Sequence, residues 1–513
     1  MSTPVLIHEA VARQTSATPG ALAVVAGHES MTYAELDSAA AFCATRLSAL
    51  GVGPGTLVPV ALPRSARLVA VLLAVLRCGA GYAALDHRWP PRRVRTVLET
   101  LKPPLFITRE PPPGHPVPLW APPAGAPPWT APGGSPAPAQ GISGDDPAAV
   151  FFTSGTSGVP KAVVSPHRAT TRLAPDAATW TGPRRAMLQA APVAWDAFSL
   201  EVWGPLMTGG RCVMAGGDRL MPGTLRSLVR GSGVDTVFLT TALFNLLVEE
   251  DLDCFSGLRT VLTGGERMSV RHARLCREAH PGLTLTNCYG PVESCVFATT
   301  GPVGDAECAA PGGVPLGTPV SRTGIHILSG DDPVAPGTVG EICVSGEGLA
   351  REYLGDPRLT AEKFPNVRVA GTPTRIYRTG DLGAVDGDGV LHFRGRGDRQ
   401  VKVAGHRVEP QEIEEAGRAV PGVRACVVTA QRDGTDGTVR LALFYTTEPP
   451  GTPGHRDLSP ADLRRELAAA LPPYLVPHRL SRQPAFPLTP NGKVDHAALT
   501  ALLATPLDPA ALR

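Results

Sequence analysis

One stretch of the chain combines glycines, small hydroxyl residues and a lysine in a way that suits an anionic ligand. The residues are Thr153, Ser154, Gly155, Thr156, Ser157 and Gly158, and the stretch closes with Lys161. Glycines allow backbone N–H groups to approach anionic oxygens, hydroxyls add donors, and the lysine adds positive charge. The pattern predicts a phosphate-binding loop, although it lacks Walker A spacing. A polar linker is the alternative interpretation, and no G-x-S-x-G context supports Ser154 as a hydrolase nucleophile.

A second candidate is Lys493, which follows a Thr-Pro-Asn-Gly turn. Lysine is scarce in this chain, and arginine supplies the remaining positive charge. The five lysines are Lys102, Lys161, Lys363, Lys402 and Lys493. Because lysine and arginine differ in geometry and titration, a lysine retained against this bias is more often needed as lysine. The scarcity favours a functional interpretation of Lys493 over that of an exposed loop lysine.

Composition limits the functions that the chain can have. Its 513 residues are 43% apolar and 18% charged, which predicts a folded protein of more than one domain. A net charge of +2 and 5% aromatic residues argue against nucleic-acid binding. Ten cysteines without C-x-x-C spacing give no zinc or disulfide framework and fit a cytoplasmic protein. The longest apolar run, 68–76, is too short to span a membrane.

The elements that must position these residues alternate between strands and helices. Residues 8–51 are expected to form a helix, one short strand and a second helix, and Thr32 followed by Glu35 predicts a capping box at a helix start. Strands are expected at 56–62 and 80–86, on either side of an apolar helix at 65–78. This β-α-β alternation predicts a parallel sheet and an α/β fold.

Further along, short glycine-punctuated strands between about 315 and 395 predict a β-rich subdomain. A stretch rich in Pro, Ala and Gly at 111–143 is expected to be a solvated loop. A fresh α+β pattern follows residue 398 and ends in a helix at 460–471. We therefore predict a large N-terminal α/β domain with a β-rich subdomain and a small α+β C-terminal domain. The expected boundaries are 1–397, a hinge at 398, and 399–513.

Ten segments, in order along nearly the whole chain, resemble the motifs of the adenylate-forming superfamily, which also contains acyl-CoA synthetases and luciferases. Within it, the similarity is to the adenylation domains of nonribosomal peptide synthetases. The segments are 31–36, 76–86, 153–161, 195–199, 287–293, 340–354, 377–382, 395–402, 471–474 and 487–493. Agreement at this number of ordered segments does not arise by chance.

The resemblance implies a reaction in two steps that uses ATP and Mg²⁺. A carboxylate attacks the α-phosphate of ATP to give an acyl-adenylate and pyrophosphate, and a thiol then attacks the acyl carbon. It implies that Lys493 bridges the carboxylate and the α-phosphate and that Glu293 holds Mg²⁺. It further implies that Asp381 accepts the ribose hydroxyls, Arg396 contacts ribose or phosphate, and Tyr289 stacks on adenine. Considered one at a time, these residues also have purely structural explanations. Lys493 suits an exposed loop, Glu293 a surface position after a turn, Asp381 a turn and Tyr289 a hydrophobic core.

The resemblance also implies a mobile C-terminal lobe and a carrier protein. Asp398 corresponds to the hinge about which the lobe swings between the two steps. The swing exchanges Lys493 for a face that carries Lys402, a second catalytic candidate, and Gly405, which leaves room for a pantetheine arm. Twenty residues follow Lys493 and hold no carrier motif, so we expect a stand-alone enzyme that serves a separate carrier protein. The sequence leaves open a need for an MbtH-like accessory protein.

Asp196 is implied to pair with the ammonium group of an amino-acid substrate, although it also suits a helix N-cap. The implied pocket residues are Ala197, Leu200, Phe238, Leu262, Gly264, Cys288, Val296 and Phe297. None is charged, so a polar substrate side chain would lack partners. The pocket predicts an apolar, branched aliphatic amino acid, with a β-amino acid or a small aromatic one as open alternatives.

Several positions depart from the family pattern. Val292 stands where threonine is usual, Trp195 where phenylalanine is common, and Glu352 where glycine is usual. Ala404 and Gln411 depart from the motif near the expected thiolation face. The expected role is secondary-metabolite biosynthesis of the antibiotic type. An acyl- or aryl-CoA ligase and a non-catalytic adenylate-binding scaffold are the two alternatives.

Overall fold

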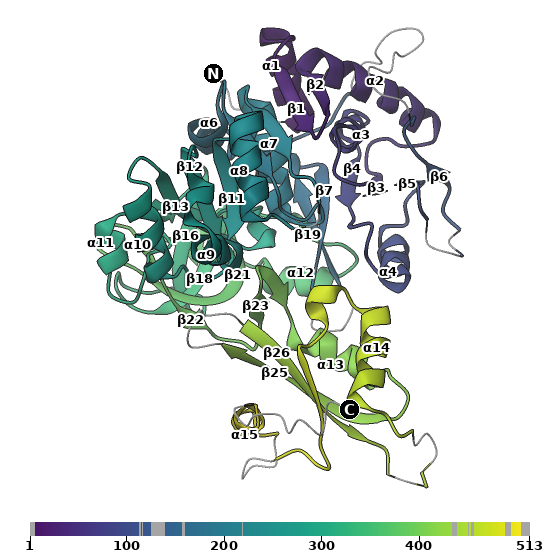
Figure 1. The fold of residues 1–513 in the computed structure, drawn as a ribbon, viewed down its shortest axis with the longest axis vertical. Coiled ribbons are helices and arrows are strands. Elements are labelled where there is room, and N and C mark those ends of the chain that lie inside the picture. Colours follow the sequence, from purple (N-terminus) through teal and green to yellow (C-terminus); the bar gives the residue numbers. More distant parts are fainter. Residues whose placement is uncertain are drawn as a thin grey trace. The chain divides into compact units, whose positions relative to one another are not determined.

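The computed structural model describes residues 6–111, 114, 116–124, 139–155, 160–217, 219–432, 439–449, 451–452, 456–487 and 494–503. Its helices and strands are shown in Figure 1. Two compact units are present. The first contains Met1–Arg88, Val97–Phe152 and Lys161–Asp398, and the second contains Trp89–Thr96, Thr153–Pro160 and Arg399–Arg513.

The largest sheet of the first unit has nine strands and is parallel through its centre. Its strands, in spatial order, are β15 (Thr318–Pro319), β14 (Thr299–Pro302), β13 (Thr284–Tyr289), β12 (Thr260–Gly264), β11 (Thr236–Thr240), β9 (Ala186–Gln189), β10 (Arg211–Met214), β1 (Leu22–Ala26) and β2 (Glu29–Thr32). Pairing is parallel from β13 to β1 and antiparallel at both edges. The helices along this part of the chain are α6 (Ala174–Thr181), α7 (Asp196–Thr208), α8 (Pro222–Ser232), α9 (Thr241–Glu250) and α10 (Val270–Ala279). The carboxyl ends of the parallel strands therefore share one edge.

A seven-stranded sheet holds the predicted β-α-β unit. Its order is β19 (Glu352–Tyr353), β8 (Lys161–Pro166), β7 (Pro147–Thr153), β4 (Gly81–Ala84), β3 (Leu57–Ala61), β5 (Phe106–Thr108) and β6 (Leu119–Trp120). Strands β3 and β4 pair in parallel and are connected in sequence through α3 (Ala66–Arg77), as predicted. Helix α3 is buried along nearly its whole length and packs against α2 (Tyr33–Ala49), because almost all of its residues are apolar.

The capping box predicted at the start of α2 is present. The backbone N–H of Glu35 donates to Thr32 Oγ1 at 3.2 Å, and the N–H of Thr32 donates to the Glu35 carboxylate at 2.7 Å. The prediction of one strand between the first two helices was wrong. Two strands, β1 and β2, form a hairpin after α1 (Ile7–Ala17), with Gly27 in the left-handed region at its turn.

The third sheet of the first unit is the predicted β-rich subdomain. Its strands are β17 (Asp332–Pro333), β16 (Thr323–Ser329), β18 (Gly340–Gly346), β21 (Thr372–Val385) and β20 (Asn366–Val369), with β22 (Leu391–Arg396) paired to β21. All pairs are antiparallel. Shorter elements of this unit are α5 (His167–Thr171), η1 (Leu252–Phe255), η2 (Val292–Ser294), α11 (Asp305–Ala309) and α12 (Pro357–Lys363).

The second unit has its own α+β core. The hairpin of β23 (Val401–Val403) and β24 (His406–Val408) precedes α13 (Pro410–Arg418). Strands β25 (Val423–Arg432), β26 (Val439–Thr447) and β27 (Arg479–Arg482) form its sheet, and the remaining elements are α14 (Pro460–Ala470), η3 (Pro473–Leu475) and α15 (His496–Ala501). Leu463 and Leu467 of α14 are buried in this core, and α14 confirms the helix predicted at 460–471. Helix α4 (Pro91–Leu101) begins in this unit and continues in the first.

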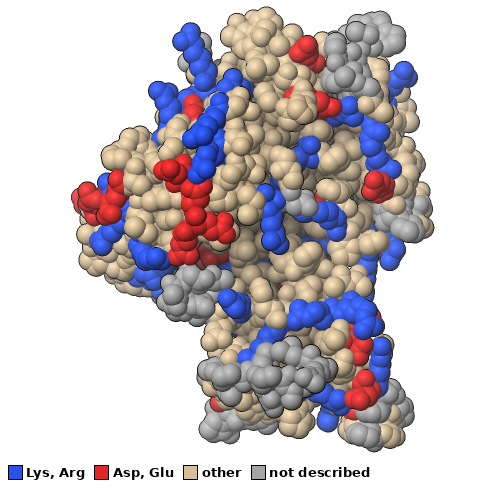
Figure 2. All heavy atoms as spheres, viewed as in Figure 1, with Lys and Arg blue, Asp and Glu red and all other residues tan. Residues whose placement is uncertain are grey.

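The segment expected to be a solvated loop at 111–143 is partly structured. Strand β6 pairs with β5, and Trp120 packs against the main core. All ten cysteines are buried with free thiols. In the described part of the chain, no helix is both long enough and apolar enough to cross a membrane. Basic and acidic side chains are interspersed on the face seen in Figure 2, without a field of one sign across it.

Candidate active site

Four of the sequence-predicted residues form one hydrogen-bonded chain in the first unit. Tyr289 at the end of β13 donates its phenol proton to Asp381 Oδ2 at 2.7 Å. Arg396 at the end of β22 donates to Asp381 Oδ1 and, through two nitrogens at 2.8 Å each, to Asp398. Burial and the adjacent Asp381 charge raise the pKa of Tyr289 well above its usual value, so the phenol keeps its proton. Strands β13, β21 and β22 thus bring the three predicted nucleotide-binding residues together.

Glu293 lies in the short helix η2 and is fully buried. Its Oε1 accepts a hydrogen bond from the phenol of Tyr353, on β19, at 2.7 Å. The backbone oxygen of Glu293 accepts from the N–H of Ala350 at 2.8 Å, which fixes the turn that carries it. A single buried and oriented carboxylate suits Mg²⁺, which binds one or two carboxylates together with substrate phosphates. Within the described ranges, no group of three or more His, Cys, Asp or Glu side chains forms a metal site.

Asp196 is the first residue of α7, where a carboxylate is favoured by the helix dipole. Its Oδ1 accepts from the N–H of Ala197 at 2.9 Å, and its Oδ2 accepts from the N–H of Val296 at 2.9 Å. The second bond crosses a hundred residues of sequence and ties α7 to the segment after β13. The carboxylate is therefore both a helix-terminal group and a link between two walls of the predicted pocket.

The predicted pocket residues come together in one apolar cluster. Seven of the eight are members: Ala197, Leu200, Phe238, Leu262, Cys288, Val296 and Phe297. The eighth, Gly264, lies beside Cys288 in the paired strands β12 and β13, and a side chain there would overlap the Cys288 carbonyl oxygen. The rings of Phe238 and Phe297 lie 5.6 Å apart. Sequence reasoning missed Trp180, whose ring lies 6.1 Å from that of Phe297.

The structure describes the predicted phosphate-binding loop only in part. Thr156, Ser157 and Gly158 lie outside the described residues, as does Lys493. The Ser154 hydroxyl donates to the backbone oxygen of Arg407 at 2.6 Å, and the Gly155 N–H donates to Glu412 Oε2 at 3.3 Å. Thr153 Oγ1 is buried and has no hydrogen-bond partner among the described residues. Lys161 opens β8 and is half-buried.

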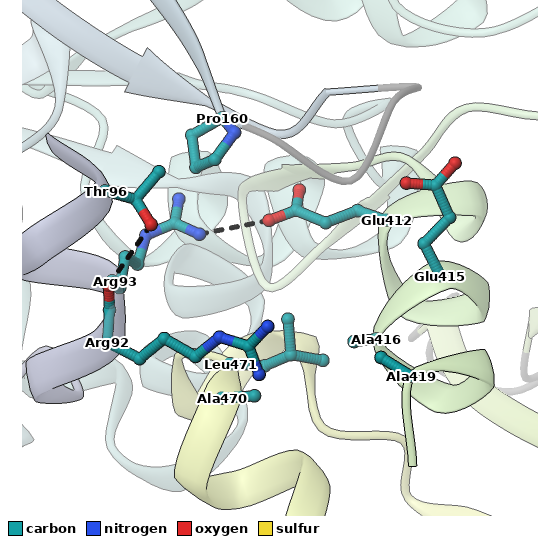
Figure 3. Close-up of a pocket in the computed structure, with 10 residues that line it drawn as sticks. All are labelled: Arg92, Arg93, Thr96, Pro160, Glu412, Glu415, Ala416, Ala419, Ala470 and Leu471. Carbon is teal, nitrogen blue, oxygen red and sulfur yellow. Dashed lines mark hydrogen bonds and ion pairs between the residues drawn. The ribbon is translucent and has the colours of Figure 1, made fainter. Parts of the chain in front are cut away.

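Glu412 also belongs to a buried ion pair in the second unit. Its Oε1 lies 3.0 Å from Arg93 Nη1, and both side chains are at most 3% exposed. Figure 3 shows the two side chains joined by this ion pair, with Pro160 nearby. Both residues line a pocket of about 260 Å³. Burial raises the pKa of Glu412, and the Arg93 charge opposes that shift. Loop residue Gly155 is thus hydrogen-bonded to a carboxylate that is itself paired with arginine.

Two further predicted residues lie in the β23–β24 hairpin. Lys402 is on β23, and Gly405 is in the two-residue turn with φ +84°. Ala404, the other turn residue, has φ +49°. Two successive residues with positive φ are typical of a type I′ turn, which favours glycine or asparagine at both positions. Ala404, which departs from the family pattern, therefore has a backbone conformation that alanine adopts only at an energetic cost.

Sequence reasoning missed a fully buried arginine beside the pocket. Arg172 follows α5 and donates to the backbone oxygens of Ser294 and Phe297 at 2.5 and 2.7 Å. It also missed Glu201 on α7, whose carboxylate accepts from the N–H groups of Ala190 and Ala191 at 3.1 and 2.9 Å. Neither residue belongs to a recognisable motif. The partners of Arg172 lie far away in the sequence, and those of Glu201 lie close to it. No signal in the sequence distinguishes them from surface charges.

Comparison with known proteins identifies the family of the chain. Residues 11–354 match the family described as AMP-binding enzyme, and residues 412–493 match the AMP-binding enzyme C-terminal domain. The chain therefore belongs to the AMP-binding enzyme family. Within that family it resembles the adenylation domains of nonribosomal peptide synthetases, in the superfamily that includes acyl-CoA synthetases.

Three relatives illustrate the likeness. The chain is 35% identical over 507 residues to malpibaldin synthetase of Mortierella alpina, covering 96% of this chain and 9% of that protein. It is 34% identical over 500 residues to surfactin synthase subunit 3 of Bacillus subtilis, covering 94% of this chain and 38% of that protein. The solved structure of PA1221, an NRPS protein with adenylation and PCP domains bound to a vinylsulfonamide inhibitor, superposes with a TM-score of 0.85 and 32% identity. That match covers 98% of this chain and 85% of the PA1221 chain. The chain thus spans well under half the length of these two synthetases.

Proposed function

We propose that this chain activates an apolar amino acid with ATP and transfers it to the phosphopantetheine thiol of a carrier protein. In the first step the amino-acid carboxylate attacks the α-phosphate of ATP, an aminoacyl-adenylate forms, and pyrophosphate leaves. In the second step the thiol attacks the acyl carbon and AMP leaves. The observation that carries the proposal is the convergence of seven predicted pocket residues in one apolar cluster, with the Asp196 carboxylate at its edge.

Asp196 is proposed to bind the substrate ammonium group, because a charge-assisted pair in a largely apolar surrounding is strong and selective. None of the eight predicted pocket residues is charged, which supports a branched aliphatic substrate, with β-amino and small aromatic acids as further candidates. Size alone discriminates weakly, at about 1–3 kcal/mol per methylene group. The amino group is therefore the feature that the site is best placed to recognise.

The nucleotide is proposed to bind at the Tyr289–Asp381–Arg396 chain and the phosphate loop. Asp381 is fixed on both oxygens, so it is oriented before a ribose arrives. The Thr153 hydroxyl, which has no partner among the residues that the structure describes, supplies a buried donor in the loop. Glu293 would hold Mg²⁺, which supplies charge neutralisation when two anions approach. Lys493 and Lys402 are proposed as catalytic lysines of the first and second steps.

The second half-reaction is proposed to require a rearrangement of the C-terminal part about Asp398, and the end of the first unit at this residue supports the assignment. Gly405 is proposed to leave room for the pantetheine arm. The PA1221 protein contains a PCP domain, which supports a carrier protein as partner. An MbtH-like accessory protein is included in the proposal as a component to be tested.

The testing experiment is amino-acid-dependent ATP–pyrophosphate exchange with proteinogenic amino acids, β-amino acids and carboxylic acids that lack an amino group. We expect exchange with one apolar amino acid, abolished in Lys493→Ala and reduced by at least about a hundredfold in Asp196→Ala. Exchange only with acids that lack an amino group would overturn the amino-acid assignment in favour of an acyl or aryl ligase. The panel is run with and without an MbtH-like protein. AMP binding without exchange under either condition would support the scaffold alternative.

Carrier loading is tested separately by incubating the active enzyme with holo-carrier protein or with coenzyme A. Loading of the carrier and not of coenzyme A is the expected result. A coenzyme A product in its place would contradict the carrier assignment while leaving the adenylation step intact.

A further inference from the structure

The segment that follows Glu293 has an unusual backbone. Cys295 and Val296 have φ of +51° and +66°, in the left-handed region that non-glycine residues rarely adopt. Val296 is β-branched, for which this region is a genuine outlier. Such a conformation persists only where the surroundings hold it in place, and it occurs preferentially at functional sites.

Arg172 holds this segment from one side. Its Nη2 lies 2.5 Å from the backbone oxygen of Ser294, 3.3 Å from that of Cys295 and 2.7 Å from that of Phe297. The side chain is fully buried. Burial lowers the pKa of Arg172 to about 10, so the guanidinium remains charged at neutral pH. All three contacts come from Nη2, whereas Nε and Nη1 are buried without a hydrogen-bond partner among the described residues. A buried charge that binds three carbonyls of one short segment is a specific backbone clamp.

Asp196 holds the same segment from the other side. Its Oδ2 accepts the N–H of Val296, the residue between two carbonyls that Arg172 binds. The side chains of Val296 and Phe297 meanwhile belong to the apolar pocket cluster. One short segment therefore carries two pocket walls and a hydrogen-bond donor to the proposed ammonium-binding carboxylate.

We infer that Arg172 is a positioning residue that fixes the amino-acid pocket and the orientation of Asp196. Without the guanidinium, Cys295 and Val296 relax towards ordinary φ values. The Val296 N–H then leaves Asp196, and the Val296 and Phe297 walls move. The consequence is weaker amino-acid binding and poorer discrimination among apolar side chains. Nucleotide binding is affected much less, because Glu293 keeps its own hydrogen bonds to Tyr353 and Ala350. This inference rests on the proposed amino-acid-activating function.

A glycine offers an independent way to disturb the clamp. A methyl group at Gly348 would overlap the guanidinium of Arg172. Gly348→Ala therefore pushes Arg172 from its place without changing its charge. Gly231 on α8 has no atom within 4 Å of a Cβ built there, so Gly231→Ala is the matched control. Arg211, which donates to the backbone oxygen of Ser232 at 2.7 Å at the start of β10, gives Arg211→Met as the control for Arg172→Met.

The experiment measures pyrophosphate exchange in wild type, Arg172→Met, Arg172→Lys and Gly348→Ala, with KM for the amino acid and for ATP taken separately. We expect Arg172→Met to raise the amino-acid KM by about tenfold or more, the range expected when hydrogen bonds from a charged group are lost. The ATP KM should stay within about twofold. Arg172→Lys should recover part of the loss, and the ranking of apolar amino acids should flatten. Both control variants should match the wild type.

Different results overturn different claims. A wild-type enzyme without exchange on any amino acid overturns the proposed function and this inference together. An active wild type with unchanged amino-acid KM and selectivity in Arg172→Met overturns this inference alone. Equal rises of both KM values would point to a general structural role and also overturn it. If Arg172→Met does not fold, judged by thermal unfolding, Arg172→Lys and Gly348→Ala decide by the same criteria.

Discussion

The phenol of Tyr289 donates a hydrogen bond of 2.7 Å to Asp381, across 92 residues of sequence. Asp381 is the carboxylate that we propose to bind the ribose, and Tyr289 is the ring that we propose to stack on adenine. The two proposed nucleotide contacts are therefore coupled before any ligand binds. Arg396 completes the arrangement by holding the other carboxylate oxygen.

Tyr289→Phe separates the ring from the hydrogen bond. The ring remains available for stacking, but one Asp381 oxygen loses its donor and the carboxylate is less well oriented. We expect the KM for ATP to rise by about tenfold, since a hydrogen bond to a charged group contributes about 1.5–3 kcal/mol. The KM for the amino acid should not change. Both values are measured by pyrophosphate exchange.

Tyr445→Phe is a suitable control, because that phenol donates to the backbone oxygen of Leu458 in the second unit. An ATP KM within about twofold of wild type in Tyr289→Phe would show that the phenol does not orient Asp381.

The buried carboxyl group of Glu201 leads to a prediction about how the stability of the protein depends on pH. It is fully buried, and burial raises its pKa from 4.5 to about 8, against the lowering effect of the N–H donors of Ala190 and Ala191. Arg64 binds the carbonyls of the same two residues at 2.7 and 3.0 Å. The unfolded chain releases the Glu201 proton near pH 4.5, whereas the folded chain keeps it up to about pH 8. This contribution to stability is complete below pH 4.5 and is lost as the pH rises towards 8.

Glu201→Gln has no such titration. We therefore expect the free energy of unfolding of the wild type to fall relative to that of Glu201→Gln between pH 5 and 8, by up to about 1.4 kcal/mol per pH unit. Denaturant unfolding of both proteins at several pH values measures the difference. A pH-independent difference would mean that Glu201 is ionised in the folded protein across this range.

The buried ion pair of Arg93 and Glu412 leads to a prediction about the stability of the protein. Both groups are almost fully buried, so removing one leaves the other charge without its partner. We expect Arg93→Met to destabilise the protein by about 3–5 kcal/mol. The double variant Arg93→Met with Glu412→Gln should recover much of this loss, because no buried charge remains.

Thermal and denaturant unfolding of the wild type, both single variants and the double variant form a double-mutant cycle. Additive effects of the two substitutions would contradict a coupled buried pair. Arg465→Met is a control, since Arg465 forms an exposed ion pair with Asp462 that should contribute little.

The sequence predicts parts of the fold from local patterns, whereas it predicts the pocket only through the resemblance to a known family. The β-α-β unit around α3 and the capping box at Thr32 follow from local patterns that determine local structure. The pocket positions are implied by the resemblance to adenylation domains, and two of them, Leu262 and Cys288, lie on the paired strands β12 and β13.

Other contacts have no local signal. Tyr353 reaches Glu293 across 60 residues, and Arg172 reaches Phe297 across 125. Such pairs arise when sheets assemble, and neither partner's neighbours in sequence mark it as special. The second strand of the β1–β2 hairpin was missed for a related reason, because a lone Gly27 is a weak turn signal.

The last prediction concerns the turn at Ala404 and Gly405. Both residues have positive φ, and Ala404 at +49° is in a region that is unfavourable for alanine by about 1–2 kcal/mol. Ala404→Gly removes this strain, although the added freedom of glycine in the unfolded chain offsets part of the gain. We expect a net stabilisation of about 0.5–1 kcal/mol, and Gly405→Ala should destabilise for the opposite reason. Chemical unfolding of both variants measures the two effects, with Gly231→Ala as a glycine substitution in open space. A loss of stability in Ala404→Gly would mean that the Ala404 side chain contributes more to the hairpin than its backbone conformation costs.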